Sequence, residues 1–255
     1  MSDGTPVVIA PADAELWGRL RRFTAARIAI GRAGGSVPTG PLLEFQLAHA
    51  RARDAVHRAL DAAALVAQLR AAGWDALGLH SAAADRGTYI RRPDLGRILD
   101  DASRAALESR APGCACDVVF VVADGLSALA VERHALAVLE QVRPLLAGWR
   151  LGPVCVTEQG RVAVGDEIGA LLGARLAVLL IGERPGLSSP DSLGIYLTWN
   201  PLPGRSNAER NCISNVRPEG LAYDRAARKL AQLMNEARRL GLTGVDLKDT
   251  AGLLA

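Results

Sequence analysis

The sequence has no apolar run long enough to cross a membrane, although 49% of its 255 residues are hydrophobic. A transmembrane helix needs roughly 20 consecutive apolar residues, and the strongly apolar runs here have only the length of strands. The first residues, Met-Ser-Asp-Gly-Thr-Pro, also lack the basic start and apolar centre of a secretory signal. We therefore expect a cytoplasmic protein with no membrane partner.

Lysine and aromatic residues are scarce. Lys229 and Lys248 are the only lysines, and aromatic residues make up 4% of the chain. The net charge of +3 is small for this length, and the arginines are interleaved with acidic residues. Because nucleic-acid surfaces usually carry a basic stripe with interleaved aromatic residues, we expect no nucleic-acid partner.

Several motifs of metal and catalytic sites are also missing. Of the four cysteines, Cys114 and Cys116 are too close for the usual spacing of zinc ligands, and no second pair completes a site. The chain has no Gly-x-Gly-x-x-Gly fingerprint, phosphate-binding P-loop, nucleophile elbow or metal-binding histidine pair. The sequence therefore predicts neither a protein-held metal nor a catalytic set within this chain.

Two unbroken apolar runs, residues 118–123 and 176–181, predict strands buried on both faces of a sheet. Strands alternate with helical patterns around them, which favours a mostly parallel sheet with right-handed crossovers. The expected fold class is α/β, Rossmann-like, with a mostly parallel sheet flanked by helices and a helical N-terminal portion. The change of pattern divides the chain into residues 1–112, mainly helical, and 113–255, the α/β domain.

Two helices are expected in the N-terminal portion. The first begins at Pro11 and runs towards Gly31, with Leu16, Leu20, Phe23, Ile28 and Ile30 on its inner face. The second is a long helical pattern from about Pro41 to Ala72.

A charged pair follows the second apolar run, in Gly182-Glu183-Arg184-Pro185-Gly186. Open α/β sheets bind ligands outside the carboxyl ends of their strands, so we expect Glu183, Arg184 and the Gly160–Val162 turn to line a crevice. Alternatively, Glu183 and Arg184 only pair with each other. Asp124, after the first apolar run, is either a ligand contact or a helix cap.

Short segments in order from about residue 15 to 249 carry a resemblance to a known family. They are Ala26-Arg-Ile-Ala-Ile-Gly-Arg-Ala-Gly, Ala48-His-Ala-Arg-Ala-Arg-Asp-Ala-Val-His, Arg92-Pro-Asp-Leu-Gly-Arg, Ala123-Asp-Gly-Leu-Ser-Ala, Gly160-Arg-Val, Leu180-Ile-Gly-Glu-Arg-Pro-Gly and Arg210-Asn-Cys-Ile-Ser-Asn. Together they resemble the small subunit of adenosylcobalamin-dependent ethanolamine ammonia-lyase.

The resemblance implies a role in a larger enzyme. The family's enzyme converts ethanolamine to acetaldehyde and ammonia by radical chemistry of adenosylcobalamin. A large subunit with a TIM-type barrel holds the substrate and most catalytic groups, while the small subunit helps to enclose the cofactor at the interface of a hetero-oligomer. It further implies that this chain is inactive alone. The complex would lie in the cytoplasm, either free or within a bacterial microcompartment.

The resemblance also implies three cofactor contacts, Val162, Glu183 and Cys212. Glu183 can accept hydrogen bonds from amides of the cofactor. Val162 offers an apolar or backbone contact and Cys212 a polarizable sulfur, although both residue types are common in cores. The Asp-x-His-x-x-Gly pattern of proteins that supply a histidine to cobalt is absent. We therefore expect the cofactor's own benzimidazole to remain the lower ligand, with no metal ligand from this chain.

Two other functions compete with this one. The chain could be a stand-alone α/β enzyme that acts on a phosphorylated small molecule, with Asp124 and Arg184 in its cleft. It could also be a structural partner that braces a large subunit without touching the cofactor.

Overall fold

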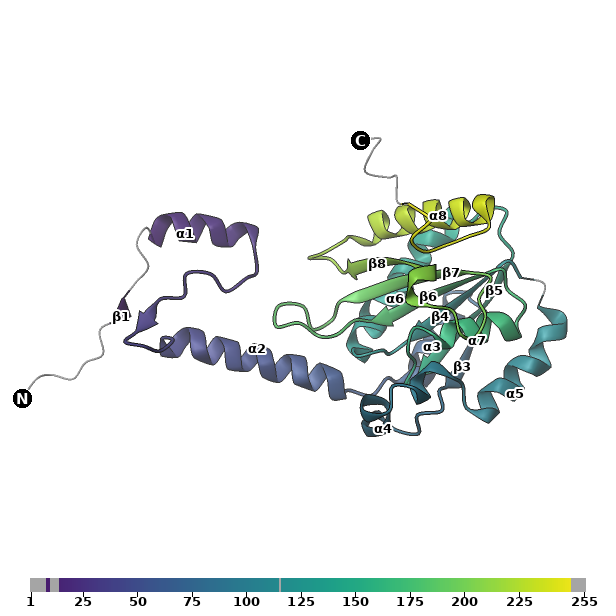
Figure 1. The fold of residues 1–255 in the computed structure, drawn as a ribbon, viewed down its shortest axis with the longest axis horizontal. Helices are drawn as coiled ribbons and strands as arrows, with labels where there is room; N and C mark the ends of the chain where they lie inside the picture. The colour runs from purple at the N-terminus through teal and green to yellow at the C-terminus, as the bar shows by residue number, and fades with distance from the viewer. Residues whose placement is uncertain (1–7, 10–13, 115, 249–255) are drawn as a thin grey trace, which may run out of the picture.

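The computed structural model describes residues 8–9, 14–114 and 116–248. Figure 1 shows an N-terminal arm that extends away from a body built around one central sheet. The N-terminal arm, residues 14–57, contains the helices α1 (Ala14–Leu20) and α2 (Thr39–His57). A two-stranded ladder of β1 (Val8–Ile9) and β2 (Arg32–Ala33) lies at its far end. The sheet body comprises residues 58–248.

The central sheet has six strands in the order β3-β5-β4-β6-β7-β8. The pairs β3–β5, β5–β4 and β4–β6 are parallel, and β6–β7 and β7–β8 are antiparallel. The bounds are β3 (Ala76–His80), β4 (Val118–Ala123), β5 (Leu151–Glu158), β6 (Leu176–Gly182), β7 (Leu193–Trp199) and β8 (Arg210–Val216). This arrangement confirms the predicted α/β class with a mostly parallel sheet flanked by helices.

Helices cover both faces of the sheet. One face packs against α3 (Ala62–Ala71), α6 (Ala128–Val142) and α8 (Tyr223–Leu240), and the other against α5 (Asp101–Arg110) and α7 (Val164–Leu171). Side chains alternate between the two cores along a strand, so Phe120 lies in the first core and Val121 in the second. Every residue of β4 and β6 is buried, as the two apolar runs predicted.

Short polar side chains mark where the helices of the body begin. Asp61, Asp100 and Ser127 each accept a hydrogen bond from a backbone N–H of the first turn that follows. The last long helix ends at Gly241, whose left-handed φ of 71° suits a glycine C-cap. The remaining elements are the short helix α4 (Arg86–Arg91) and the 3-10 helices η1 (Arg21–Phe23), η2 (Leu95–Arg97), η3 (Ala111–Gly113), η4 (Arg143–Leu145) and η5 (Asn207–Glu209). Within the described ranges, no helix has the length and hydropathy of a membrane span.

Two expectations for the N-terminal portion were wrong. The helical pattern from 41 to 72 is not one helix, because the chain is extended at Arg58 and restarts where Asp61 caps α3. The expected start of the first helix at Pro11 lies outside the described residues, and α1 ends at Leu20, before Ile28 and Ile30 of the expected inner face. The rest of that face is not covered, since Leu16, Leu20 and Phe23 are 49%, 41% and 87% exposed. Helical periodicity shows which side of a helix is apolar and does not show whether the same chain covers it.

The sheet begins before residue 112. β3 pairs with β5 from Ala76↔Val154 to His80↔Glu158, and α3 contributes to the same core as α6. The division into residues 1–112 and 113–255 stays a prediction about domains, but it does not coincide with an edge of the sheet.

Candidate functional site

A cavity of about 460 Å³ lies where the loops after β4, β5 and β6 meet. The loop after β4 leads to α6 on one face of the sheet, and the loop after β5 leads to α7 on the other. Such a divergence opens a crevice at the carboxyl ends of parallel strands, where α/β proteins bind ligands. The cavity therefore lies where the sequence predicted a site.

Two glycines bring the loops after β4 and β6 into contact. A side chain on Gly182 would place its Cβ 2.0 Å from the Ser127 carbonyl oxygen, and one on Gly125 would lie 2.2 Å from the Gly182 oxygen. Gly125 also has a φ of 54°, which favours glycine. The Leu126 N–H donates to the Gly182 carbonyl at 3.0 Å. The segments 124–127 and 181–184 therefore contact each other directly through their backbones.

A third segment, α4 with the turn that follows it, packs against the loop after β5 and contributes Tyr89 to the lining of the cavity. Gly96 packs so tightly that an added Cβ would lie 2.9 Å from the Gln159 oxygen and from Arg161 Cγ. The Arg161 N–H donates to the Gly96 carbonyl at 2.7 Å. Tyr89 is fully buried here and donates its hydroxyl to the Gly160 carbonyl at 3.2 Å. Tyr89 could not be recognised from the sequence as a residue of the site, because the polar stretch around it has no strand or helix periodicity.

Asp124 lies behind the cavity and does not face a ligand. Its side chain has no exposed surface, forms an ion pair with Arg86 at 3.1 Å and accepts a hydrogen bond from the Gly160 N–H at 3.1 Å. Burial raises the pKa of Asp124 to about 6, against the opposing effect of Arg86. Ser127, not Asp124, caps α6. Neither expected role of Asp124 is therefore correct, and it instead ties β4 to the turn after β5.

Glu183 lines the cavity and also joins three segments of the body. Its carboxylate accepts hydrogen bonds from the Ser192 hydroxyl, from the Ser214 hydroxyl at 2.5 Å and from the Asn215 N–H at 3.2 Å. The alternative pairing of Glu183 with Arg184 is not found: within the described residues Arg184 has neither a hydrogen-bond nor an ion-pair partner, and its side chain is exposed.

The structure places the two other predicted contacts near Glu183, but not equally near. Val162 is half-buried and lines the cavity. Cys212 is exposed on β8 and lies outside the lining, directly opposite Tyr196 of β7, which does line it. Although the residue as a whole is exposed, partial desolvation of its sulfur raises the pKa of the Cys212 thiol, and the hydrogen bond with the Tyr196 hydroxyl opposes that effect. Val162 and Glu183 therefore share one cavity, and Cys212 borders it through Tyr196.

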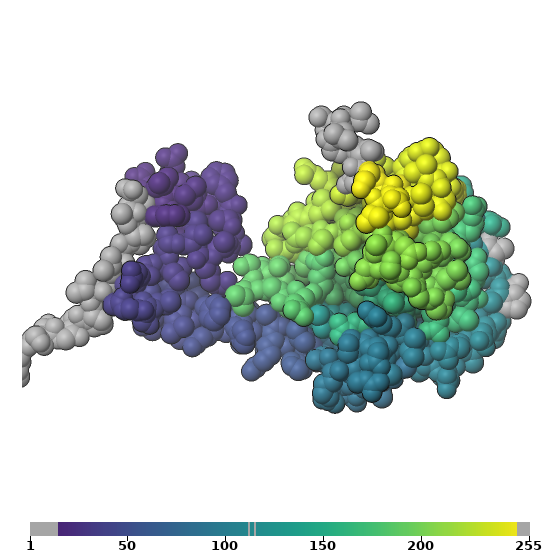
Figure 2. Space-filling view, in the orientation of Figure 1, coloured from purple at the N-terminus to yellow at the C-terminus, as the bar shows by residue number. Residues whose placement is uncertain are grey.

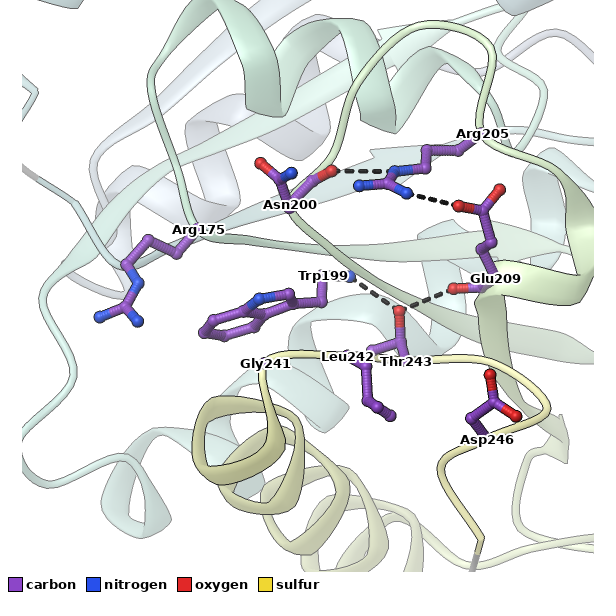
Figure 3. Close-up of a pocket in the computed structure, with 9 residues that line it drawn as sticks. All are labelled: Arg175, Trp199, Asn200, Arg205, Glu209, Gly241, Leu242, Thr243 and Asp246. Carbon is purple, nitrogen blue, oxygen red and sulfur yellow. Dashed lines mark hydrogen bonds and ion pairs between the residues drawn. The ribbon is translucent and has the colours of Figure 1, made fainter.

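A second cavity, of about 420 Å³, lies at the opposite edge of the sheet. Figure 3 shows Arg205 between the Asn200 carbonyl and the Glu209 carboxylate. Thr243 accepts a hydrogen bond from the Trp199 N–H at 2.9 Å and donates one to the Glu209 carbonyl at 2.7 Å. These contacts join loops that are distant in sequence.

No cluster of three or more histidine, cysteine, aspartate or glutamate side chains in the described ranges could hold a metal ion. Two histidines of the sheet body, His80 and His134, each have a polar partner within the chain. His80 Nδ1 lies 2.7 Å from the Ser81 carbonyl oxygen, and His134 Nδ1 lies 2.7 Å from the Tyr223 hydroxyl.

Comparison with known proteins identifies one family. The family model described as "Ethanolamine ammonia-lyase light chain (EutC)" matches residues 14–248. The ethanolamine ammonia-lyase small subunit of Pseudomonas aeruginosa strain LESB58 is 59% identical over 243 residues, which are 94% of this chain and 89% of the relative. The protein of the same name from Azotobacter vinelandii is 58% identical over 255 residues, 98% of this chain and 93% of the relative. This chain therefore belongs to the ethanolamine ammonia-lyase light-chain family.

Proposed function

We propose that this chain is the small subunit that encloses part of adenosylcobalamin against a large catalytic subunit. The complex would convert ethanolamine to acetaldehyde and ammonia in the cytoplasm, free or within a bacterial microcompartment. The observation that supports this most directly is that Val162 and Glu183 line one cavity at the carboxyl ends of the strands. The bound cofactor would supply the radical chemistry, while residues of this chain would bind it, orient it and exclude water.

The size of the cavity agrees with a shared cofactor site. Pockets of roughly 300–1,000 Å³ bury drug-sized ligands. Adenosylcobalamin carries a corrin ring, a nucleotide and an adenosyl group, so a cavity of about 460 Å³ would hold only part of it. The rest of the cofactor needs a cover from another chain, which is what a small subunit with a large partner would provide.

The lining also has the chemistry that a corrin edge requires. Apolar side chains of Leu126, Val162 and Ile181 stand beside the Glu183 carboxylate and the Ser214 hydroxyl. A carboxylate offers about four acceptor positions, of which Glu183 uses three within the chain. One position therefore remains for an amide N–H on the rim of the ring.

The N-terminal arm supplies the surface that we assign to the large subunit. Its exposed large apolar side chains are Leu16, Leu20, Phe23, Val37, Leu42, Leu43, Phe45 and Leu47. Figure 2 shows the arm standing apart from most of the sheet body, so these side chains have little of their own chain to pack against. Large exposed apolar patches usually mark protein–protein contacts. With the substrate bound mainly by that partner, we expect this chain to be inactive alone.

The direct test is to co-purify this chain with the large subunit encoded in the same genome and to measure acetaldehyde formation from ethanolamine. We expect activity only with both chains and adenosylcobalamin present. Turnover by this chain alone would support the stand-alone enzyme instead. A small subunit that is needed for assembly but has no effect on cofactor binding would support the structural partner.

Glu183 can be tested separately within the assembled complex. Glu183→Ala is expected to weaken cobalamin binding by about 1–3 kcal/mol, measured by equilibrium dialysis. Ser192→Ala is the matched control, because it removes a hydrogen bond to the same carboxylate from a buried residue outside the cavity lining. If both variants weakened binding equally, Glu183 would act only by bracing the β6–β7 hairpin.

A further inference from the structure

We infer that Arg161 and Arg184 form an anion subsite in the cavity after β4, β5 and β6, and that this subsite holds the phosphodiester of the cofactor's nucleotide. The inference rests on the proposed function and specifies which part of the ligand this chain holds. It follows from the charges around the cavity, where the acidic groups have partners within the protein and the guanidinium groups of Arg161 and Arg184 have no carboxylate partner among the described residues.

The acids near the cavity are already engaged. Glu183 accepts its three hydrogen bonds from Ser192, Ser214 and Asn215, and none of these donors is an arginine. Asp124 is completely buried and pairs with Arg86. Neither carboxylate is therefore the ion-pair partner of Arg161 or Arg184.

Arg161 is held in place without a carboxylate partner. Its guanidinium lies over the Tyr89 ring, 4.1 Å from the centroid, and its Nη2 donates to the Tyr89 carbonyl at 3.3 Å. Its Nε is buried and has no hydrogen-bond partner among the described residues. Stacking on an aromatic ring fixes the planar group and leaves its charge uncompensated.

Arg184 supplies the second charge from the other side of the cavity. It follows Glu183 directly, lines the same cavity and is exposed, with no ion pair in the described part of the chain. The N-terminus of the 15-residue helix α6 begins at the same edge, just after Leu126 of the lining. The positive end of its dipole adds to the field of the two arginines.

A phosphodiester matches this arrangement. Guanidinium groups bind phosphate oxygens through paired, charge-assisted hydrogen bonds. The rest of the lining is apolar or neutral apart from the engaged Glu183, which suits a ligand with one anionic group among neutral amides. The nucleotide arm of a cobalamin carries one phosphodiester, whereas cobinamide, the corrinoid without that nucleotide, carries none.

The experiment compares the two corrinoids on the assembled complex. We expect Arg184→Gln to weaken cobalamin binding roughly 10- to 100-fold, as for a lost hydrogen bond to a charged group, and to leave cobinamide binding unchanged. Arg175→Gln is the matched control, because Arg175 is also exposed but lines the cavity at the opposite edge of the sheet. It should change neither affinity. Inorganic phosphate should compete with cobalamin more strongly than with cobinamide.

The outcomes separate this inference from the proposed function. Cobalamin binding that is unchanged in Arg184→Gln, or cobinamide binding that weakens equally, would overturn the anion subsite while the cofactor-binding role stands. A wild-type complex that binds neither corrinoid would overturn the cofactor-binding role itself. Arg161→Gln is a second variant, and because Arg161 packs on Tyr89 its folding must be checked first.

Discussion

The N-terminal arm and the sheet body both contain strongly apolar segments, but only the body covers them with its own chain. Helix α2 has 19 residues and buries only Ala48 and Ala55. Strand β4 has six residues and buries all of them. The difference shows that the apolar pattern of the arm is not part of this chain's core, and it agrees with a surface that a partner covers.

Matched phenylalanine substitutions should give the largest contrast between the two regions. Phe120 of β4 is completely buried, whereas Phe45 of α2 is 42% exposed. Phe120→Ala should lower the free energy of unfolding by about 3–5 kcal/mol, because it leaves a cavity in the core. Phe45→Ala should change it by about 0.5 kcal/mol or less, as expected for a surface site. Urea denaturation of the isolated chain measures both values.

The two phenylalanine substitutions should have effects in the reverse order on assembly with the large subunit. Phe45→Ala should weaken co-purification with the large subunit, because it removes an apolar contact from the arm. Phe120→Ala should leave the arm unchanged in any molecules that still fold. A large loss of stability from Phe45→Ala would instead show that the arm packs on its own body in solution.

Sequence patterns predicted those features of the molecule that depend on residues close together in the chain. The apolar runs of β4 and β6 specify buried strands, and their carboxyl ends located the cavity that contains Glu183. The partners of Glu183 could not be predicted, because Ser192 and Ser214 reach it only through the antiparallel pairing of β6, β7 and β8. The same limit applies to Tyr89, which reaches the cavity from the short helix α4, whose sequence has no periodic apolar pattern.

Matched aspartate substitutions should give the next largest contrast. In the body, Asp166 forms a two-pronged ion pair with Arg210 at 2.6 and 2.7 Å, and both side chains are buried. Asp166→Ala should cost about 3–5 kcal/mol, because it leaves the Arg210 charge buried without its partner. In the arm, Asp54 is 73% exposed and lies 3.7 Å from Arg53. Asp54→Ala should cost about 1 kcal/mol at most.

Thermal and urea denaturation of the two aspartate variants provide the measurement. Equal losses of stability in Asp166→Ala and Asp54→Ala would mean that side chains around Arg210 repack and compensate for the lost ion pair. In that case Asp166→Asn, which keeps the shape of the side chain, should be indistinguishable from wild type. If the pair is as important as its burial indicates, Asp166→Asn should also be destabilised.

The smallest predicted effect is a dependence of stability on pH, and it comes from Asp117, just before β4. Asp117 accepts hydrogen bonds from the Arg150 guanidinium at 2.9 Å and from the Arg150 N–H at 3.0 Å, which lower the pKa of the carboxyl to about 2. Between the unfolded value of 3.8 and about 2, the unfolded chain binds more protons than the folded chain. The stability that Asp117 contributes is therefore complete above about pH 4 and is lost as the pH falls towards 2. Urea denaturation at pH 5, 4 and 3 should show the advantage of wild type over Asp117→Asn shrinking with falling pH. An advantage that stayed constant across that range would mean that Arg150 stabilises the fold independently of the Asp117 charge.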